Sequence, residues 1–105
     1  MVEKKSRICI VVHSSPERED SHTLHKITAA ALASGHSVQI FLMNDGVYHL
    51  LRETFDDLLN KGAEVTVCAH NAVERGVPER AGVSFGSQYN LAVMVAASDV
   101  FLSLH

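Results

Sequence analysis

The sequence has 105 residues, which is enough for one compact domain with one core. Its net charge is −3 and its nine Lys and Arg residues form no basic stripe, so strong nucleic-acid binding is not expected. No apolar run approaches the roughly 20 residues of a membrane-spanning helix, and the run after the charged N-terminal stretch is too short for a signal peptide. We therefore expect a single cytoplasmic domain, residues 1–105, without a membrane span.

The elements expected in the first half of the chain alternate between strand and helix. A continuous apolar run opens this half, as is typical of a strand buried on both faces of a parallel sheet. The patterns that follow predict a strand over Ile8–Val12, a helix from Asp20 or Ser21 to Ser34, a strand over Val38–Met43 and a helix with apolar spacing over Val47–Leu59.

The second half continues the alternation. We expect a strand over Glu64–Ala69, a short helix through Arg75, a loop over Val77–Ser84 with a brief edge strand near Val83, a last helix capped by Ser84, and a strand over Asp99–Leu104. The expected apolar face of the last helix comprises Phe85, Tyr89, Ala92, Val93 and Ala96.

This alternation predicts a small flavodoxin-like, three-layer α/β domain with a mainly parallel sheet of four to five strands. The simplest strand order places strand 1 between strands 2 and 3, with a crevice between the carboxyl ends of strands 1 and 3. Polar residues and one cysteine follow the strands at this edge: His13, Asn44, Asp45, Cys68 and His70.

Cofactor and metal motifs are absent from the sequence. It contains neither GxGxxG nor the phosphate-binding loop GxxxxGK, so we expect no nucleotide or flavin cofactor. The two cysteines form no CxxC pair, and the seven histidines have no recognised metal-ligand spacing. Cys9 lies inside an apolar strand, where a small buried thiol is expected.

Cys68 is the main candidate for chemistry. It lies where a strand ends and a helix begins, close to the backbone amides that can stabilise a thiolate. The alternative is that Cys68 packs as a small apolar side chain. His13, His49 and His70 could have a metal-binding or acid–base role, with His70 able to shuttle a proton to Cys68, or all three could be ordinary polar residues at the rim of a sheet.

Three further residues have both a functional and a structural explanation. Asp45 and Gly46 could line the site, or could supply the turn that starts the second helix. Arg75 could face an anionic sulfur species, or could complement the dipole at the end of a short helix.

Three segments together resemble the DsrE/DsrF-like family, which includes sulfur-relay subunits of the TusD and DsrE type. They are the first strand, the turn Asn44–Val47 and the block Cys68–Val77, and the similarity covers nearly the whole chain. Its most specific part is the cysteine followed, seven and eight residues later, by Arg75 and Gly76. The resemblance implies a domain that forms homotrimers or hexamers and whose active members carry a persulfide on the equivalent of Cys68.

We therefore expect a sulfur-relay protein in which Cys68 is the catalytic nucleophile that accepts sulfane sulfur and passes it to a sulfur-carrier protein. The candidate substrate-binding residues are Asp45, Gly46, His70 and Arg75, and neither a cofactor nor a metal is expected. Two alternatives stay open. One is a non-catalytic oligomeric subunit or small-ligand-binding module, and the other is a redox or metal sensor that uses Cys68 with His13 or His70.

Overall fold

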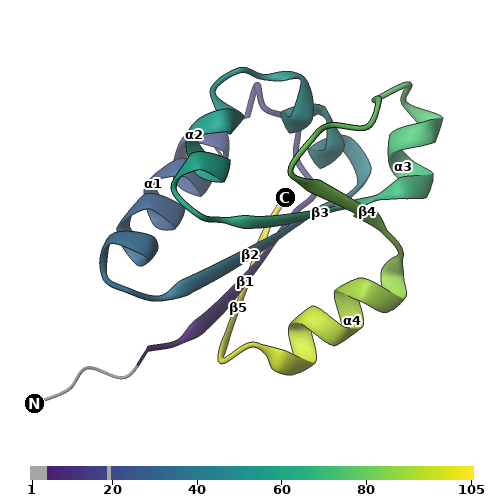
Figure 1. The fold of residues 1–105 in the computed structure, drawn as a ribbon. Coiled ribbons are helices and arrows are strands. Elements are labelled where there is room, and N and C mark those ends of the chain that lie inside the picture. Colours follow the sequence, from purple (N-terminus) through teal and green to yellow (C-terminus); the bar gives the residue numbers. More distant parts are fainter. Residues whose placement is uncertain (1–4, 19) are drawn as a thin grey trace, which may run out of the picture.

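The computed structural model describes residues 5–18 and 20–105, which form one α/β domain (Figure 1). Its single sheet has five parallel strands: β1 (Arg7–Val12), β2 (Ser37–Leu42), β3 (Glu64–Cys68), β4 (Val83–Gly86) and β5 (Val100–Leu104). The helical elements are α1 (Asp20–Ala33), the 3-10 helix η1 (Asn44–Leu51), α2 (Phe55–Asn60), α3 (Ala69–Glu74) and α4 (Gln88–Ala97).

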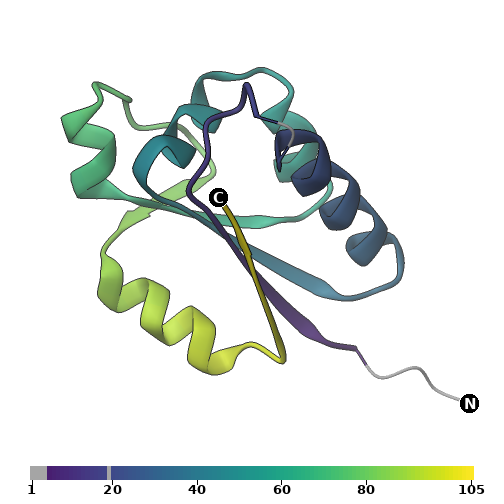
Figure 2. The same cartoon turned by 180° about the vertical axis from the view of Figure 1, so that it is seen from behind.

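Helices cover both faces of the sheet, as Figures 1 and 2 show from opposite sides. The helices α1 and α2 lie with η1 on one face, and α4 lies on the other. This arrangement confirms the expected three-layer α/β fold with a parallel sheet. None of the helices in the described part of the chain is both long and apolar enough to cross a membrane.

The strand order is β4-β3-β2-β1-β5, so the expected placement of strand 1 between strands 2 and 3 is wrong. The first three crossovers all step in the same direction, and right-handed connections place their helices on one face. The connection through α4 then returns across the opposite face and adds β5 beside β1. Consequently strands 1 and 3 are not neighbours, and no crevice lies between their carboxyl ends.

The sheet separates two apolar cores of unequal size. The larger lies under α1, η1 and α2, and it includes the fully buried side chains Ile10, Leu24, Ile40, Phe55 and Leu58. The smaller lies under α4 and consists of Cys9, Val11, Phe41, Cys68 and Met94. Cys9 is completely buried, which confirms its expected place in the core. Burial raises the pKa of its thiol, because a thiolate would lose its hydration there.

The helix expected over Val47–Leu59 is two elements, η1 and α2. Leu51 is 58 % exposed although it belongs to the apolar pattern, so the pattern does not continue on one buried face. The backbone N–H of Arg52 donates to the carbonyl of His49 at 3.1 Å, and this contact closes η1 before α2 begins.

The last helix begins three residues later than expected from a Ser84 cap. The edge strand expected near Val83 is confirmed as β4, but it continues through Ser84 to Gly86, and Phe85 packs against the larger core from this strand. Ser87 caps α4. The expected helix face is also wrong, because Met94 is buried and Leu91 partly buried, whereas Tyr89 and Val93 are exposed. Apolar residues occur all around α4, so their spacing could not indicate which side faces the sheet.

Candidate functional site

Cys68 is the last residue of β3 and the N-cap residue of α3. Its backbone is extended, with φ −65° and ψ 108°, and the chain turns directly from the strand into the helix. The residue is only 5 % exposed and belongs to the apolar cluster under α4. The sequence therefore correctly placed Cys68 at the junction of strand and helix.

Cys68 lines a cavity of about 580 Å³ at the carboxyl edge of the sheet. The walls come from the ends of β2, β3 and β4 and from the first turns of α3 and α4, and the lining residues are Met43, Asn44, Cys68, Ala69, His70, Asn71, Gly86, Ser87, Gln88 and Tyr89. Cavities of a few hundred Å³ are typical of sites for small ligands. Of the proposed site residues, the cavity brings together Cys68 and His70.

The wall opposite Cys68 was not foreseen as part of the site. Gly86 pairs with Cys68 in the sheet, and a Cβ atom on Gly86 would lie 2.5 Å from Oδ1 of Asn90. That Oδ1 accepts the backbone N–H of Ser87 at 2.8 Å, while the Ser87 hydroxyl accepts the N–H of Tyr89 at 3.2 Å. The spacing of Ser87 and Asn90 matches a capping box and could have located this helix start from sequence.

Two asparagines connect the remaining walls. The backbone N–H of Asn44 donates to Oδ1 of Asn71 at 2.8 Å, which links the end of β2 to the first turn of α3. Asn44 has φ +51°, a left-handed conformation that asparagine adopts more readily than most residues. The contact fixes α3 three residues after Cys68 and so holds the entrance to the cavity in shape.

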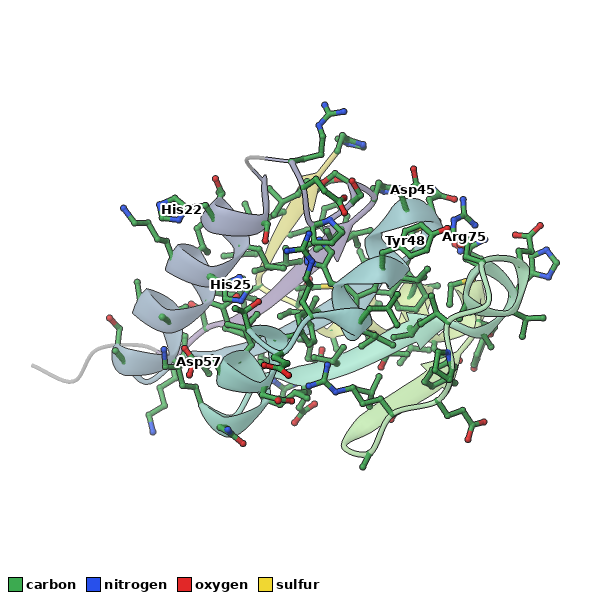
Figure 3. All side chains as sticks on the ribbon, turned by 90° about the horizontal axis from the view of Figure 1, so that it is seen from above. His22, His25, Asp45, Tyr48, Asp57 and Arg75 are labelled. Carbon is green, nitrogen blue, oxygen red and sulfur yellow. The ribbon has the colours of Figure 1, made fainter. Side chains whose placement is uncertain are left out.

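The other proposed substrate-binding residues lie beside the cavity and do not line it. Nε of Arg75 donates to Oδ1 of Asp45 at 3.0 Å, and this ion pair ties the end of α3 to η1 (Figure 3). Gly46 is buried against the end of β1, where an added Cβ would lie 2.0 Å from the carbonyl oxygen of Val12. In this arrangement all three residues shape the scaffold around the site.

His13 lies outside the lining of the cavity. Its ring stacks on His105 with centroids 4.8 Å apart, and its Nδ1 accepts a hydrogen bond from Nδ2 of Asn44 at 3.0 Å. Burial, and secondarily the charge of His105, lowers the pKa of His13. His49 is buried in η1, where burial lowers the pKa of its imidazole and Nε2–H donates to the carbonyl of Ser14.

Residues 5–18 and 20–105 contain no group of three or more His, Cys, Asp or Glu side chains that could hold a metal ion. His70 instead lies near Glu74 on the exposed side of α3, with 3.6 Å between Nε2 and Oε2.

Comparison with known proteins gives the family. The model of the DsrE/DsrF-like family matches residues 6–104, nearly the whole chain. The chain belongs to this family. The resemblance to this family is thereby confirmed, and the family is generally related to sulfur relay.

Individual relatives extend the comparison. The uncharacterised protein MK0008 of Methanopyrus kandleri is 28 % identical over 107 residues, with 88 % of each chain covered. The crystal structure of the ychN protein from E. coli has a TM-score of 0.72 at 24 % identity, covering 94 % of this chain and 99 % of that one. Protein BT1422 from Bacteroides thetaiotaomicron has a TM-score of 0.76 at 15 % identity, covering 94 % and 95 %. At these identities the two solved structures support the fold alone.

Proposed function

We propose that this DsrE-like protein accepts sulfane sulfur on Cys68 as a persulfide and passes it to a partner protein. The observation that supports the proposal is the position of Cys68 in the wall of the 580 Å³ cavity, at the carboxyl edge of the sheet. Cys9, in contrast, is completely buried in a strand and lines no such cavity. Both cysteines are free thiols, the state that a reducing cytoplasm maintains.

The position of Cys68 suits a carrier more than a dithiol enzyme. A thiolate that attacks a sulfane sulfur becomes a persulfide, and the second sulfur must then be protected until an acceptor thiol arrives. Cys68 is 5 % exposed, so most of its surface is shielded while the cavity leaves room for the added sulfur. Sulfur transfer to an acceptor restores the thiol without a second cysteine.

The test is the intact mass of the reduced protein after incubation with the persulfide of 2-mercaptoethanol. We expect a gain of about 32 Da, one sulfur atom, that peptide mapping places on Cys68. Cys68→Ala should abolish the gain, and Cys9→Ala serves as the matched control that should retain it.

Two results would contradict the proposal. One is a mass gain that persists in Cys68→Ala, and the other is a native protein that gains no sulfur and whose Cys68 alkylates no faster than a model thiol. The second result would favour the non-catalytic subunit or ligand-binding module. Disulfide formation or bound metal in place of persulfide would favour the sensor.

We also propose that the protein assembles into a homo-oligomer through the outer side of α4. This helix carries no charged residue from Gln88 to Ala97, yet only Met94 is buried. Tyr89 is 76 % exposed and Val93 is 51 % exposed. A helix that is apolar all round is ordinarily covered, and a neutral, apolar copy of the same surface matches its chemistry.

Sedimentation of the native protein should therefore give a mass of several chains, with a trimer or hexamer as the specific expectation. Val93→Lys should shift the measured mass toward that of the monomer, because the change would bury a charge in the interface. Leu51→Lys, at a residue of similar exposure on η1, should leave the assembly intact. A native monomer, or equal effects of the two changes, would refute this interface.

A further inference from the structure

We infer that the cavity beside Cys68 selects its sulfur donor by charge, accepting an organic persulfide with an uncharged tail and disfavouring anionic donors such as thiosulfate. The inference rests on the proposed role of Cys68 as a sulfur acceptor. It adds the chemical class of the donor, which neither the fold nor the position of the cysteine specifies.

The lining of the cavity has no permanently charged side chain. Its ten residues include no Lys, Arg, Asp or Glu. Three of them carry neutral amide side chains, which can donate and accept hydrogen bonds without attracting either sign of charge: Asn44, Asn71 and Gln88. An anion that entered would give up water without gaining a cationic partner from these walls.

The charged side chains next to the cavity reinforce this discrimination. Arg75 is the cation at the end of α3, and it is paired with Asp45 at 3.0 Å and with Glu74 at 3.7 Å. Two carboxylates against one guanidinium give these three side chains a net charge of −1. The pairing of Arg75 therefore leaves no unpaired guanidinium beside the cavity on this side.

Two of the backbone donors at the start of α4 are already occupied. The Ser87 hydroxyl accepts the N–H of Tyr89, and Oδ1 of Asn90 accepts the N–H of Ser87. These two donors, which often hold anions at helix starts, are thus occupied by the capping box.

What the cavity offers instead is apolar, polarisable surface beside the thiol. Met43 and Ala69 line it beside Cys68. A thioether is soft and polarisable, and it packs well against alkyl groups and sulfur. The tail of a small organic persulfide can therefore lie on this surface while its terminal sulfur meets Cys68.

The transfer step is balanced without a further reactant. The Cys68 thiolate attacks the terminal sulfur of R–S–SH, a new S–S bond forms, and the donor S–S bond breaks. Its electron pair leaves with R–S⁻, which takes up the proton that Cys68 released. The net reaction is Cys68–SH + R–S–SH → Cys68–S–SH + R–SH, and no net oxidation occurs.

Donors that differ only in tail charge test the inference. We would compare the persulfide of 2-mercaptoethanol with that of mercaptoacetate, and add thiosulfate as a small dianion. The readout is the rate of sulfur gain on Cys68, with an acetylated and amidated cysteine peptide as the reference thiol. For each thiol we would divide the rate with the uncharged donor by the rate with the carboxylate donor. We expect this rate ratio to be at least about tenfold higher for Cys68 than for the peptide, as one like-charge interaction predicts.

Substitutions at Gln88 provide the matched pair, since this residue is exposed at the start of α4 and lines the cavity. Gln88→Lys should lower the rate ratio of Cys68 toward that of the peptide and should speed the reaction of Cys68 with thiosulfate. Gln88→Glu should raise the rate ratio.

A ratio equal to that of the peptide and unchanged in Gln88→Lys would overturn the charge selection while leaving the persulfide carrier intact. If no donor adds sulfur to Cys68, the proposed function fails, and the inference fails with it.

Discussion

Replacing Gly46 by alanine tests whether this residue has a structural role, namely the close packing of η1 against the end of β1. The new Cβ would lie 2.0 Å from the carbonyl oxygen of Val12 and 2.8 Å from its carbonyl carbon, where ordinary contacts begin at 3.4 Å. Both partners are backbone atoms, so no side chain can rotate away. Relief requires η1 to move from the end of β1 by about 1 Å or more, which a close-packed interior resists.

The expected cost is about 3 kcal/mol, at the upper end of typical overpacking effects. For a domain of this size, this cost corresponds to a decrease of about 1 to 2 M in the midpoint of urea unfolding. Because the chain contains no tryptophan, unfolding is followed by circular dichroism. Gly76→Ala is the matched control, because Gly76 has φ +67° and open space around its Cα. Only backbone strain of about 1 kcal/mol is expected there. A Gly46→Ala protein as stable as Gly76→Ala would refute the packing argument.

Three further expectations concern stability and the shape of the cavity. Thr28→Val should raise the free energy of unfolding by about 1 kcal/mol in the same assay, since the buried Thr28 hydroxyl has no hydrogen-bond partner among the described residues, and a decrease would contradict this. Lowering the pH from 7.5 to 5.5 should destabilise the protein, because His49 takes up its proton in the unfolded chain near pH 6.5 but only at lower pH when folded. His49→Gln should reduce this pH dependence, leaving the part due to His13, and an unchanged pH profile would contradict the assignment. Asn71→Ala should cost about 0.5 to 1 kcal/mol, because water can reach the exposed Asn44 amide, and should alter the alkylation rate of Cys68 by releasing the end of β2 from α3, whereas an unchanged alkylation rate would contradict this role.

The fold class could be predicted because each of its signals is local. Ile8–Val12 is apolar on both faces, as expected for a strand in a covered parallel sheet, and β1 lies there. The strand order could not be obtained in the same way, because apolar periodicity does not specify in which direction a crossover steps. The position of β5 beside β1 depends on contacts made across almost the whole chain.

Within the candidate site, the position of the cysteine could be predicted, but the walls of the cavity could not. Cys68 stands at a change of periodicity that the sequence displays directly, from the alternation of β3 to the first turn of α3. Gln88 and Tyr89 enter the cavity only because β4 pairs with β3 and brings Gly86 opposite Cys68. Asp45 and Arg75 were expected to bind the substrate, and in the structure they form an ion pair with each other beside the cavity.

The pairing of β1 with β5 has a consequence for biosynthesis. β1 is synthesised well before β5, and the backbone groups along its outer edge have no strand to pair with until α4 and β5 have emerged. At ordinary elongation rates of about 5 to 20 residues per second, this interval lasts several seconds, far longer than local helices need to form. During that time the nascent chain presents an apolar strand edge that can recruit other chains, so β1 is the segment where chaperone binding and translational misfolding should concentrate.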